Sequence, residues 1–573
     1  MTIVARDEVD GVATFWVDSG RPTLAATLMF RWGSADEPAA ESGWQHLLEH
    51  LALHERMGGG QLQVNGEVSL HHTSFDAHGP TDAVAAHLSG VARWLSEPSF
   101  ARMDTERRVL AAEAAQRSSV GLPNALGMRY GAAGPGVVAF GELGLGRATR
   151  ELLGTRARTV FTRENAVLML DGPPPPGWRL PLPSGRLRFP EPAHTVEELP
   201  AGYVDVGLLA SGVVRRTPAA TLLPETLRRE FVNEFRERLG GAYAPFCGYE
   251  YADVDHAVAY VGTDIDGAAH RGCATTAREL LETHAQRGPD EAVVSGIKAM
   301  TIQGLRDPYA TYGLARRAGA MHLAGEDPYL SLDQVVADYE AITANDVRVH
   351  AAELLDSLLL GMPVLADELL MMRTVSRPTT TPRVPPTQGR KHADWPARLD
   401  RLVVDGHGTM MTSGDQALDY PHADLAAYLT YPSGVRRLVR ADGWGLLIDP
   451  AEWVGGADAV ASLDAAVPGD LHIPQRDVDG PTPFSRASLG RRYRGLVEMS
   501  GRKDPVLKTD PTARLMAFGI GLLFVLVVVA IVMTVHSRFD LIDTTPDYPR
   551  VEMPDKVIVP LGLGAPRDVP AGD

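Results

Sequence analysis

The chain has 573 residues, of which 45% are hydrophobic, and its formal net charge at pH 7 is −17. Such an acidic protein is repelled by a phosphate backbone, so we expect no nucleic-acid partner. Only two cysteines occur, Cys247 and Cys273, which excludes a disulfide framework and a zinc site built from cysteines.

The first predicted element is a strand over residues 23–32, which are mostly apolar. Residues 1–7 have neither a basic segment nor an apolar core, so we expect no signal peptide. A turn with the sequence G-S-A-D-E-P follows at residues 33–38. The next predicted element is a helix that carries the sequence H-L-L-E-H at residues 46–50.

This helix contains a candidate zinc site. His46 and His50 are four residues apart, so they lie on the same face of a helix. Two imidazoles at this spacing can bind one tetrahedral zinc ion and leave positions for a third protein ligand and a water molecule. Glu49 borders the metal without being a ligand, as a general base must, and the order H-x-x-E-H is the inverzincin signature. The alternative interpretation is a polar helix face with two solvated histidines.

Further segments follow in a recognisable order. Three glycines at 58–60 precede a hairpin-like stretch that ends at Phe75, and residues 81–95 have the amphipathic pattern of a helix. The turn E-P-S-F at 97–100 leads to a helix with the sequence E-R-R-V-L-A-A-E at 106–113. Together with the G-S-A-D-E-P turn and H-L-L-E-H, these segments resemble the pitrilysin/insulinase family of zinc metallopeptidases, over most of the first 365 residues.

The resemblance implies further residues of the site. Glu113 would be the third zinc ligand, although it follows His50 more closely than is usual in the family. Glu106 lies two helical turns before Glu113 and shares its face, and the resemblance implies that it supports the metal site from behind the ligands. The alternative for Glu106 is a surface carboxylate paired with an arginine. His54 continues the four-residue series, but the family has no ligand there, and we expect it to be solvated.

The resemblance also predicts the domain organisation and an α+β fold class. Residues 1–171 would form the zinc-binding α/β domain, and the proline-rich residues 172–200 a linker. Residues 201–370 would form a second, homologous α/β domain without the zinc motif. In both domains, mostly antiparallel sheets would be covered by helices. Thr343 is expected to cap a helix of the second domain.

The second domain contains a candidate substrate-binding element. Residues 234–243 read E-F-R-E-R-L-G-G-A-Y and resemble a family segment whose arginine and tyrosine hold the substrate backbone and polarise the scissile carbonyl. Arg236 and Tyr243 match these two catalytic positions. Because other positions of the segment depart from the family pattern, Arg238 could replace Arg236. The alternative is a helix that ends at the two glycines, with Tyr243 at the start of a buried strand.

The last third of the chain contains a linker and a small module. Residues 371–397 are rich in proline and threonine, as in an extended linker. Residues 398–474 have strand–turn–strand patterns with D-G turns, which indicate a small β-rich module. It shows no catalytic constellation, and the pattern is compatible with a pleckstrin-homology-like binding module.

Residues 515–535 form an apolar run without a charge, which is long enough for one transmembrane helix. Residues 475–514 before it form a basic juxtamembrane segment, and residues 536–573 after it form an acidic, proline-rich tail. The positive-inside rule then predicts a single-pass protein of the cell membrane, with the N-terminal catalytic part in the cytoplasm and the tail outside.

The sequence therefore predicts a membrane-anchored, zinc-dependent endopeptidase that hydrolyses peptides or unfolded segments, with Glu49 as the general base. We expect the substrate to bind as an added strand on a sheet edge. The family encloses its substrate with four α/β domains, and this chain offers two, so the resemblance implies a homodimer. Two alternatives remain open: a non-catalytic scaffold subunit, and a processing subunit that is active only beside a different partner chain.

Overall fold

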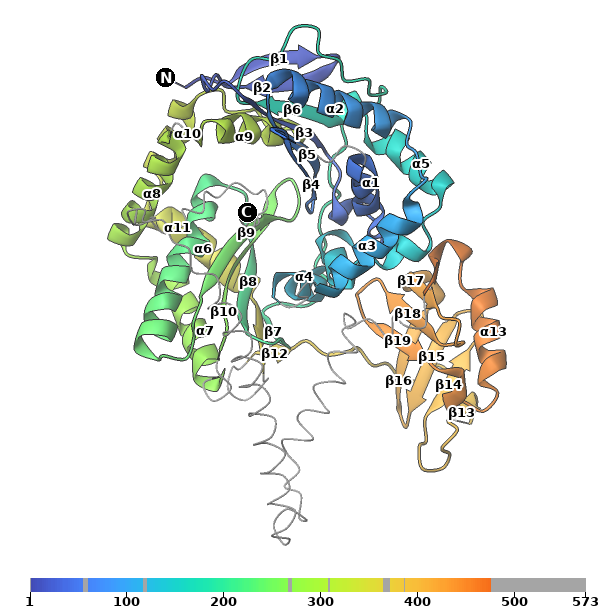
Figure 1. Cartoon of the computed structure of the whole chain (residues 1–573). Coiled ribbons are helices and arrows are strands. Elements are labelled where there is room, and N and C mark those ends of the chain that lie inside the picture. Colours follow the sequence, from blue (N-terminus) through green and yellow to red (C-terminus); the bar gives the residue numbers. More distant parts are fainter. Residues whose placement is uncertain are drawn as a thin grey trace, which may run out of the picture. The chain divides into compact units, whose positions relative to one another are not determined.

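The structure is a computed structural model of the chain (Figure 1). In the part of the chain that the structure describes, whose residue ranges are given at the end of this paragraph, no helix is long and apolar enough to cross a membrane. The predicted transmembrane segment 515–535 and its basic and acidic flanks lie outside these residues. The structure describes residues 2–54, 60–116, 121–265, 270–307, 310–363, 372–385 and 387–475.

A six-stranded sheet forms the centre of the first α/β unit. Its strand order is β1-β2-β6-β3-β5-β4, so β4 is an edge strand. Strands β2 and β6 are parallel, and the other neighbouring pairs are antiparallel. The strands are β1 (Ala5–Val9), β2 (Val12–Trp16), β3 (Leu24–Phe30), β4 (Gln63–Val68), β5 (Thr73–Gly79) and β6 (Ala166–Leu170).

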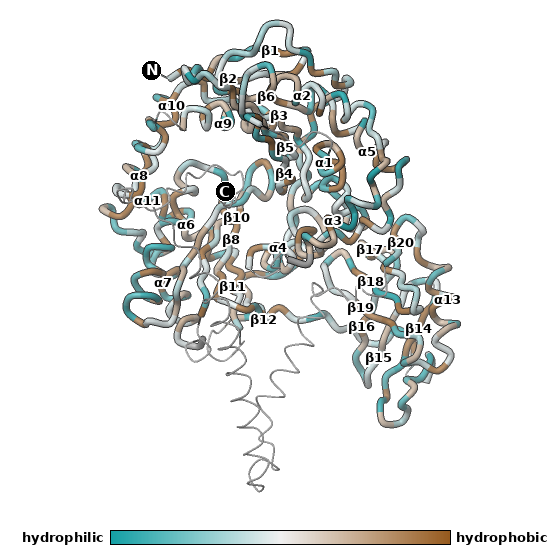
Figure 2. Tube along the Cα trace, in the orientation of Figure 1, coloured by the Kyte–Doolittle hydropathy of each residue, from teal (hydrophilic) through white to brown (hydrophobic). Residues whose placement is uncertain are grey.

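Helices pack against this sheet on the side where the predicted zinc motif lies. The amphipathic helix predicted at residues 81–95 is confirmed as α2. Figure 2 shows apolar positions along α1, and Leu47, Leu48 and Leu51 are among the residues of this helix that enter the core between helix and sheet. The helices are α1 (Trp44–Leu53), α2 (Thr81–Ser96), α3 (Met103–Gln116), α4 (Leu122–Tyr130) and α5 (Arg150–Val160), with short 3-10 helices η1 (Ser34–Asp36), η2 (Ala39–Glu41), η4 (Gly134–Phe140), η5 (Leu143–Gly146) and η6 (Arg163–Asn165).

The second unit repeats the connectivity of the first. Its strand order is β12-β7-β11-β8-β10-β9. Strands β7 and β11 are parallel, and β11, β8, β10 and β9 are antiparallel in turn, which is the pattern of β2, β6, β3, β5 and β4. The strands are β7 (Ala201–Val204), β8 (Leu208–Arg215), β9 (Phe246–Tyr251), β10 (His256–Thr263), β11 (Leu359–Met362) and β12 (Arg373–Thr374).

The helices of the second unit include one with a predicted cap. The Thr343 hydroxyl accepts a hydrogen bond from the backbone N–H of Asp346, which confirms Thr343 as the N-cap of α11. A π-helix continues α6 at its C-terminal end. The helices are α6 (Pro218–Phe231), η7 (Val232–Arg238), α7 (His270–Arg287), α8 (Glu291–Arg306), α9 (Tyr312–Leu323), α10 (Leu332–Ala341) and α11 (Ala344–Asp356).

The two units share a hydrophobic core. Along β6, Leu168 and Leu170 enter the core beneath α1 and α2. Val167 and Met169 point to the opposite face, as alternate residues of a strand do, and belong to the same core cluster as Leu314 of α9. All five residues of β6 are buried. The first sheet is therefore covered on one face by its own helices and on the other by a helix of the second unit.

The segment expected as the first linker, residues 172–200, contains no helix or strand. Its first part packs against the first unit, where Trp178, Leu180 and Leu182 are buried in the core, whereas residues 183–200 are half-buried or exposed. The expected linker thus has no regular secondary structure, and three apolar side chains near its start are packed. Prolines interrupt backbone pairing, but the apolar side chains between them still bury their surface.

The last described part of the chain is β-rich. Two four-stranded sheets have the orders β13-β14-β15-β16 and β19-β18-β17-β20, and helix α13 (Gly456–Ala466) packs with them. Strands β12 and β13 fall within residues 371–397, which were expected to be only a linker. The strands are β13 (Arg390–Lys391), β14 (Arg401–Val404), β15 (Gly408–Ser413), β16 (Gln416–Pro421), β17 (Leu425–Thr430), β18 (Arg436–Arg440), β19 (Gly445–Ile448) and β20 (His472–Pro474), with short helices η9 (His422–Asp424), η10 (Pro450–Glu452) and η11 (Gly469–Leu471).

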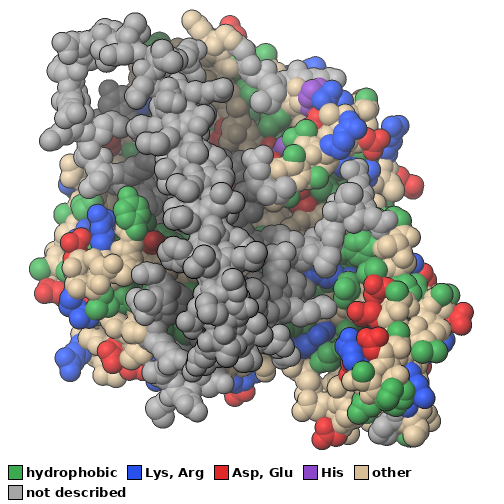
Figure 3. Space-filling model, turned by 60° about the horizontal axis from the view of Figure 1, so that its bottom comes forward, with side chains coloured by type: hydrophobic (Ala, Val, Ile, Leu, Met, Phe, Trp, Pro, Cys, Tyr) green, Lys and Arg blue, Asp and Glu red, His purple; other side chains and the backbone are tan. Residues whose placement is uncertain are grey.

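Charged side chains are interspersed on the face that Figure 3 shows. Lys and Arg lie beside Asp and Glu over the visible part of this face. The negative net charge of the whole sequence is therefore not gathered into one large acidic area there.

Candidate metal centre

Helix α1 carries the H-L-L-E-H motif and begins directly after Gly43. The φ angle of Gly43 is +87°, and a Cβ there would lie 2.6 Å from the Cβ of Glu142, so both conformation and space require glycine. Glu37 accepts hydrogen bonds from backbone N–H groups at the start of the helix. Its carboxylate accepts from the N–H groups of Gly43 (2.9 Å) and Gln45 (2.7 Å). Burial raises the pKa of Glu37 to about 7, although Arg156 and these hydrogen bonds act in the opposite direction.

His46, His50 and Glu113 lie close enough together to hold one metal ion. The Glu113 Oε2 atom is 3.8 Å from Nε2 of His46 and 3.6 Å from Nε2 of His50. One ligand atom from each of the three residues lies within 4.8 Å of the others. A tetrahedral zinc ion with bonds of about 2 Å separates its ligand atoms by roughly 3.3 Å. The donor set and its spacing therefore fit zinc.

Helix α3 brings Glu113 to α1 through a stripe of three residues. Leu110 is fully buried in the core, and Glu106 and Glu113 lie on either side of it at helical spacing. The stripe faces α1, so both carboxylates reach the histidines. Glu106 and Glu113 thus lie on the same face of α3, as their seven-residue separation predicted.

Glu106 lies behind His50. Its side chain is only 7% exposed, and Oε2 lies 3.5 Å from Nδ1 of His50. The other oxygen, Oε1, accepts a hydrogen bond from Arg102 (3.3 Å) and lies 3.7 Å from Nδ1 of His54. Glu106 therefore contacts both the histidine and an arginine, but it is buried and is not a surface carboxylate. His54 is half-buried beside Glu106 rather than fully solvated.

Glu142 lies behind His46, and it was not among the residues predicted from the sequence. Its Oε1 atom is 2.5 Å from Nδ1 of His46. Both histidines thus have Nδ1 directed to a carboxylate and Nε2 directed to Glu113, an arrangement that fixes the ring orientation of metal-bound histidines. Glu142 is 92 residues after His50 in a glycine-rich stretch without secondary-structure periodicity. Only its acidic side chain could have indicated a role.

Glu49 is buried beside the histidines. It is 5% exposed, and its Oε2 atom lies 3.7 Å from Nε2 of His46. Its other oxygen faces Gly66 of the edge strand β4, where an added Cβ would lie only 2.2 Å from Oε1. Burial and the neighbouring His46 lower the pKa of His50, although Glu113 and Glu106 oppose this shift. A neutral imidazole is the form that binds a metal.

Arg236 and Tyr243 form a separate pair on the second unit. The guanidinium carbon of Arg236 lies 6.0 Å from the centre of the Tyr243 ring. Arg238 instead pairs with Glu234. The interpretation of Tyr243 as the start of a buried strand is wrong, because Tyr243 is 76% exposed and β9 begins only at Phe246.

The loop at Tyr243 has a clear physical cause. The Asp264 carboxylate accepts hydrogen bonds from the N–H groups of Tyr243 (3.1 Å) and Ala244 (3.0 Å). These donors are therefore not available to a neighbouring strand. These hydrogen bonds help to hold the pKa of Asp264 below its usual range.

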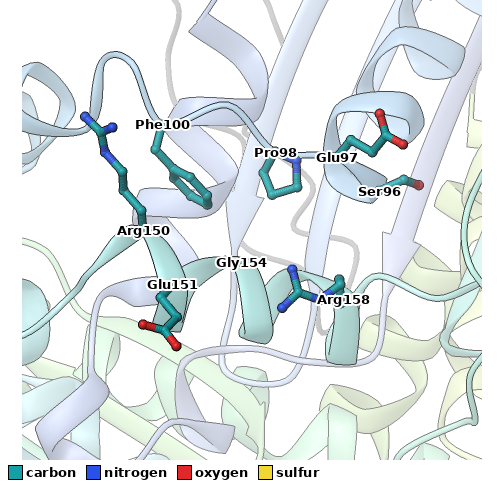
Figure 4. A pocket seen from close by; sticks show the side chains of 8 residues that line it. All are labelled: Ser96, Glu97, Pro98, Phe100, Arg150, Glu151, Gly154 and Arg158. Atoms are coloured by element: carbon teal, nitrogen blue, oxygen red, sulfur yellow. The ribbon is translucent and has the colours of Figure 1, made fainter.

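A pocket of about 550 Å³ lies elsewhere, between the end of α2 and helix α5. In Figure 4, Phe100 and Pro98 lie between Arg150 on one side and Arg158 on the other. No residue predicted for the site lines it. Its lining residues are Ser96, Glu97, Pro98, Phe100, Arg150, Glu151, Gly154 and Arg158.

Comparison with known proteins identifies the fold. No protein-family model matches the sequence, and no curated protein matches it. Solved structures do match over about two thirds of the chain. The first half of the periplasmic protease PqqL from Escherichia coli is 14% identical, with a TM-score of 0.50, and the match covers 64% of this chain and 95% of that one.

Two further structures give the same result. The inactive domain of a peptidase M16 from Pseudomonas fluorescens is 15% identical, with a TM-score of 0.52 and coverage of 63% and 98%. A protease from Helicobacter pylori is 13% identical, with a TM-score of 0.51 and coverage of 63% and 100%. The chain therefore has the fold of M16, pitrilysin-like peptidases, a fold that also occurs in an inactive domain.

Proposed function

We propose that the protein is a zinc-dependent endopeptidase with the metal held by His46, His50 and Glu113. The proposal rests on one observation: the three metal-binding side chains lie beside the buried carboxylate of Glu49. The Oε2 atom of Glu49 is 3.7 Å from Nε2 of His46. A scaffold protein has no need for a general base beside a metal-binding group. The retention of all four side chains therefore favours a catalytic protein over a non-catalytic scaffold.

In the proposed mechanism, the zinc ion, the general base and the carboxylates behind the histidines have different roles. Zinc, when bound, acts as a Lewis acid that makes water nucleophilic near neutral pH. Glu49 accepts the proton of the attacking water and returns it to the leaving amine. Glu106 and Glu142 hold the Nδ1 atoms of the two histidines, so that both Nε2 atoms face Glu113.

The proposed substrate is a peptide or an unfolded segment. Strand β4 is the last strand of its sheet, and an edge strand can pair with an extended backbone. Gly66 of β4 lies against Glu49, so a peptide paired along β4 would pass close to the general base. A folded protein offers few extended segments, and we therefore expect it to be a poor substrate.

The proposed assembly is a homodimer. Tyr243 and Arg236 are largely exposed on one unit, whereas the metal-binding residues belong to the other. In a twofold dimer, the Arg236–Tyr243 pair of one protomer would complete the site of its partner. The alternative is a processing subunit that needs a different partner chain.

The proposed location follows from sequence alone. The apolar run at 515–535 would anchor the protein in the cell membrane, and the basic residues before it would keep the catalytic part in the cytoplasm. The substrates would then be cytoplasmic peptides or the inner ends of membrane proteins.

The experiment that tests this function compares the full-length protein with its Glu49→Gln variant. Each is incubated with a mixture of unstructured peptides, and the products are identified by mass spectrometry. The wild type should cleave peptides, and Glu49→Gln should retain zinc and lose cleavage, because the substitution removes the base and keeps the ligands. Cleavage by Glu49→Gln at the wild-type rate would refute the mechanism.

A further inference from the structure

The sheet β19-β18-β17-β20 of the β-rich module is covered on both faces. Tyr428 and Leu438 enter the core of the module itself. The alternate residues Leu429 and Val439 point the other way, into a second cluster that includes Phe140 of the first unit. Three strands of this sheet are antiparallel neighbours and β20 pairs parallel to β17, and sheets built mainly from antiparallel strands commonly leave one face to water. Here the second face is buried against the unit that carries the candidate metal centre.

The part of the first unit that meets this sheet is residues 131–146, which we call the bridging segment. The N–H of Ala132 donates a hydrogen bond to the Ala441 carbonyl (2.9 Å). At the other end, Gly146 lies so close to β20 that a Cβ would be 1.9 Å from the Pro474 carbonyl oxygen. The side chain of Gln475 donates to the Leu143 carbonyl (3.3 Å). The module therefore contacts the bridging segment along its length.

The opposite side of the bridging segment contacts helix α1. The Trp44 indole donates a hydrogen bond to the Gly144 carbonyl (2.9 Å), and Glu142 reaches Nδ1 of His46 (2.5 Å). Glu142 lies between Phe140 and Leu143 in the sequence, and both of these belong to the cluster shared with the module. The residue that touches His46 is thus flanked by residues that are fixed by the module.

We propose that the β-rich module buttresses the metal centre: its second sheet holds the bridging segment, and the bridging segment holds Glu142 on His46. This inference rests on the proposed zinc site. Glu142 is then a positioning residue, which fixes the ring of His46 so that Nε2 faces the metal. Partners of this kind typically contribute a factor of about 10–100 to metal affinity. The module therefore increases zinc affinity indirectly, by keeping Glu142 in contact with His46.

The first test measures the role of Glu142 in zinc binding. The zinc dissociation constant of the full-length protein is determined by competition with a chelating dye, and cobalt is substituted to record its absorption spectrum. Glu142→Ala should weaken zinc binding about 10–100-fold and alter the cobalt spectrum. Glu142→Gln, which keeps an acceptor oxygen, should recover part of the affinity. A general loss of stability would not distinguish these two variants in this way.

The second test perturbs the contact between the module and the bridging segment, from each side in turn, at residues that do not touch the metal-binding side chains. Gly146→Val forces β20 away from the bridging segment, and Val439→Ala removes buried contact from the module side. Gly469→Val is the matched control, since a Cβ at Gly469 meets nothing within 4 Å. Gly146→Val and Val439→Ala should weaken zinc binding severalfold, whereas Gly469→Val should not. If Gly146→Val does not fold, Val439→Ala alone decides the result.

The decisive comparison combines both tests, because residues that act through one another are not additive. In the Glu142→Ala background, Gly146→Val and Val439→Ala should cause little further loss of zinc affinity. Independent, additive losses would overturn the proposal, as would wild-type zinc affinity in both Gly146→Val and Val439→Ala. If the wild type itself binds no zinc, the proposed function fails as well. If the wild type binds zinc and cleaves peptides but Gly146→Val and Val439→Ala match it, only the buttress role is refuted.

Discussion

The close approach of Gly66 to Glu49 predicts that a side chain at position 66 disables the general base. In Gly66→Val, the new Cβ would lie 2.2 Å from Oε1 of Glu49 and 2.6 Å from Cδ1 of Leu53. Ordinary contact begins at 3.4 Å, so the carboxylate oxygen has to retreat by about 1.2 Å. The end of a glutamate side chain moves easily, so the clash is relieved there rather than in the backbone of β4.

The expected effect is therefore larger on catalysis than on folding. A displacement of about 1 Å can cost about 100-fold in rate, whereas overpacking a site costs about 1–3 kcal/mol of stability, and a flexible side chain favours the lower end. We expect Gly66→Val to lower kcat about 100-fold and to leave zinc affinity close to that of the wild type.

The assay is the initial rate of hydrolysis of a quenched fluorescent peptide, with zinc content and melting temperature measured on the same samples. Gly406→Val is the control, because a Cβ at Gly406 meets nothing within 4 Å. Wild-type kcat in a folded, zinc-loaded Gly66→Val protein would refute the role of Glu49 as the base.

Three further predictions concern assembly, pH and topology. Mixing inactive Glu49→Gln with inactive Tyr243→Phe protein should restore part of the activity, because one site of the mixed dimer would be intact; sedimentation of an active protein only as a monomer contradicts this. Burial and the nearby Glu67 carboxylate raise the pKa of Glu250 from 4.5 to about 7. The folded state therefore binds the Glu250 proton more tightly than the unfolded state does, and the contribution of Glu250 to the free energy of unfolding should fall as the pH rises from about 4.5 to about 7. Glu250→Gln should flatten that part of the stability profile, and an unchanged slope in chemical denaturation would contradict the assignment. Protease added to intact cells should remove only the tail after residue 535, and loss of the His46 region would show that the orientation is reversed.

The local features of the fold were predictable from the sequence because neighbouring residues carry the signal. The amphipathic pattern at 81–95 corresponds to α2, and the Thr343 cap corresponds to the start of α11. The H-x-x-E-H spacing predicted that both histidines lie on one helix face. In the structure both are on α1, and their rings are in contact. In each case the prediction depended on side chains that lie along one continuous helix.

The features that depend on contacts between distant segments were not predictable. Glu142 meets His46 only because the bridging segment folds back over α1, and its own sequence neighbours do not indicate this. The exposed position of Tyr243 depends on Asp264, which lies 21 residues further along the chain. Strands β12 and β13 form in a proline-rich stretch because β7 and β14 offer them partners.

The most direct test of the central claim is the zinc coordination of the full-length protein, measured by X-ray absorption on metal-loaded wild type and Glu113→Ala. The wild type should bind one zinc ion per chain, with two imidazole nitrogens and a carboxylate oxygen among the ligands at about 2 Å. Glu113→Ala should lose the carboxylate ligand and bind zinc more weakly. A wild type that binds no zinc, or a zinc spectrum that Glu113→Ala leaves unchanged, would contradict the account.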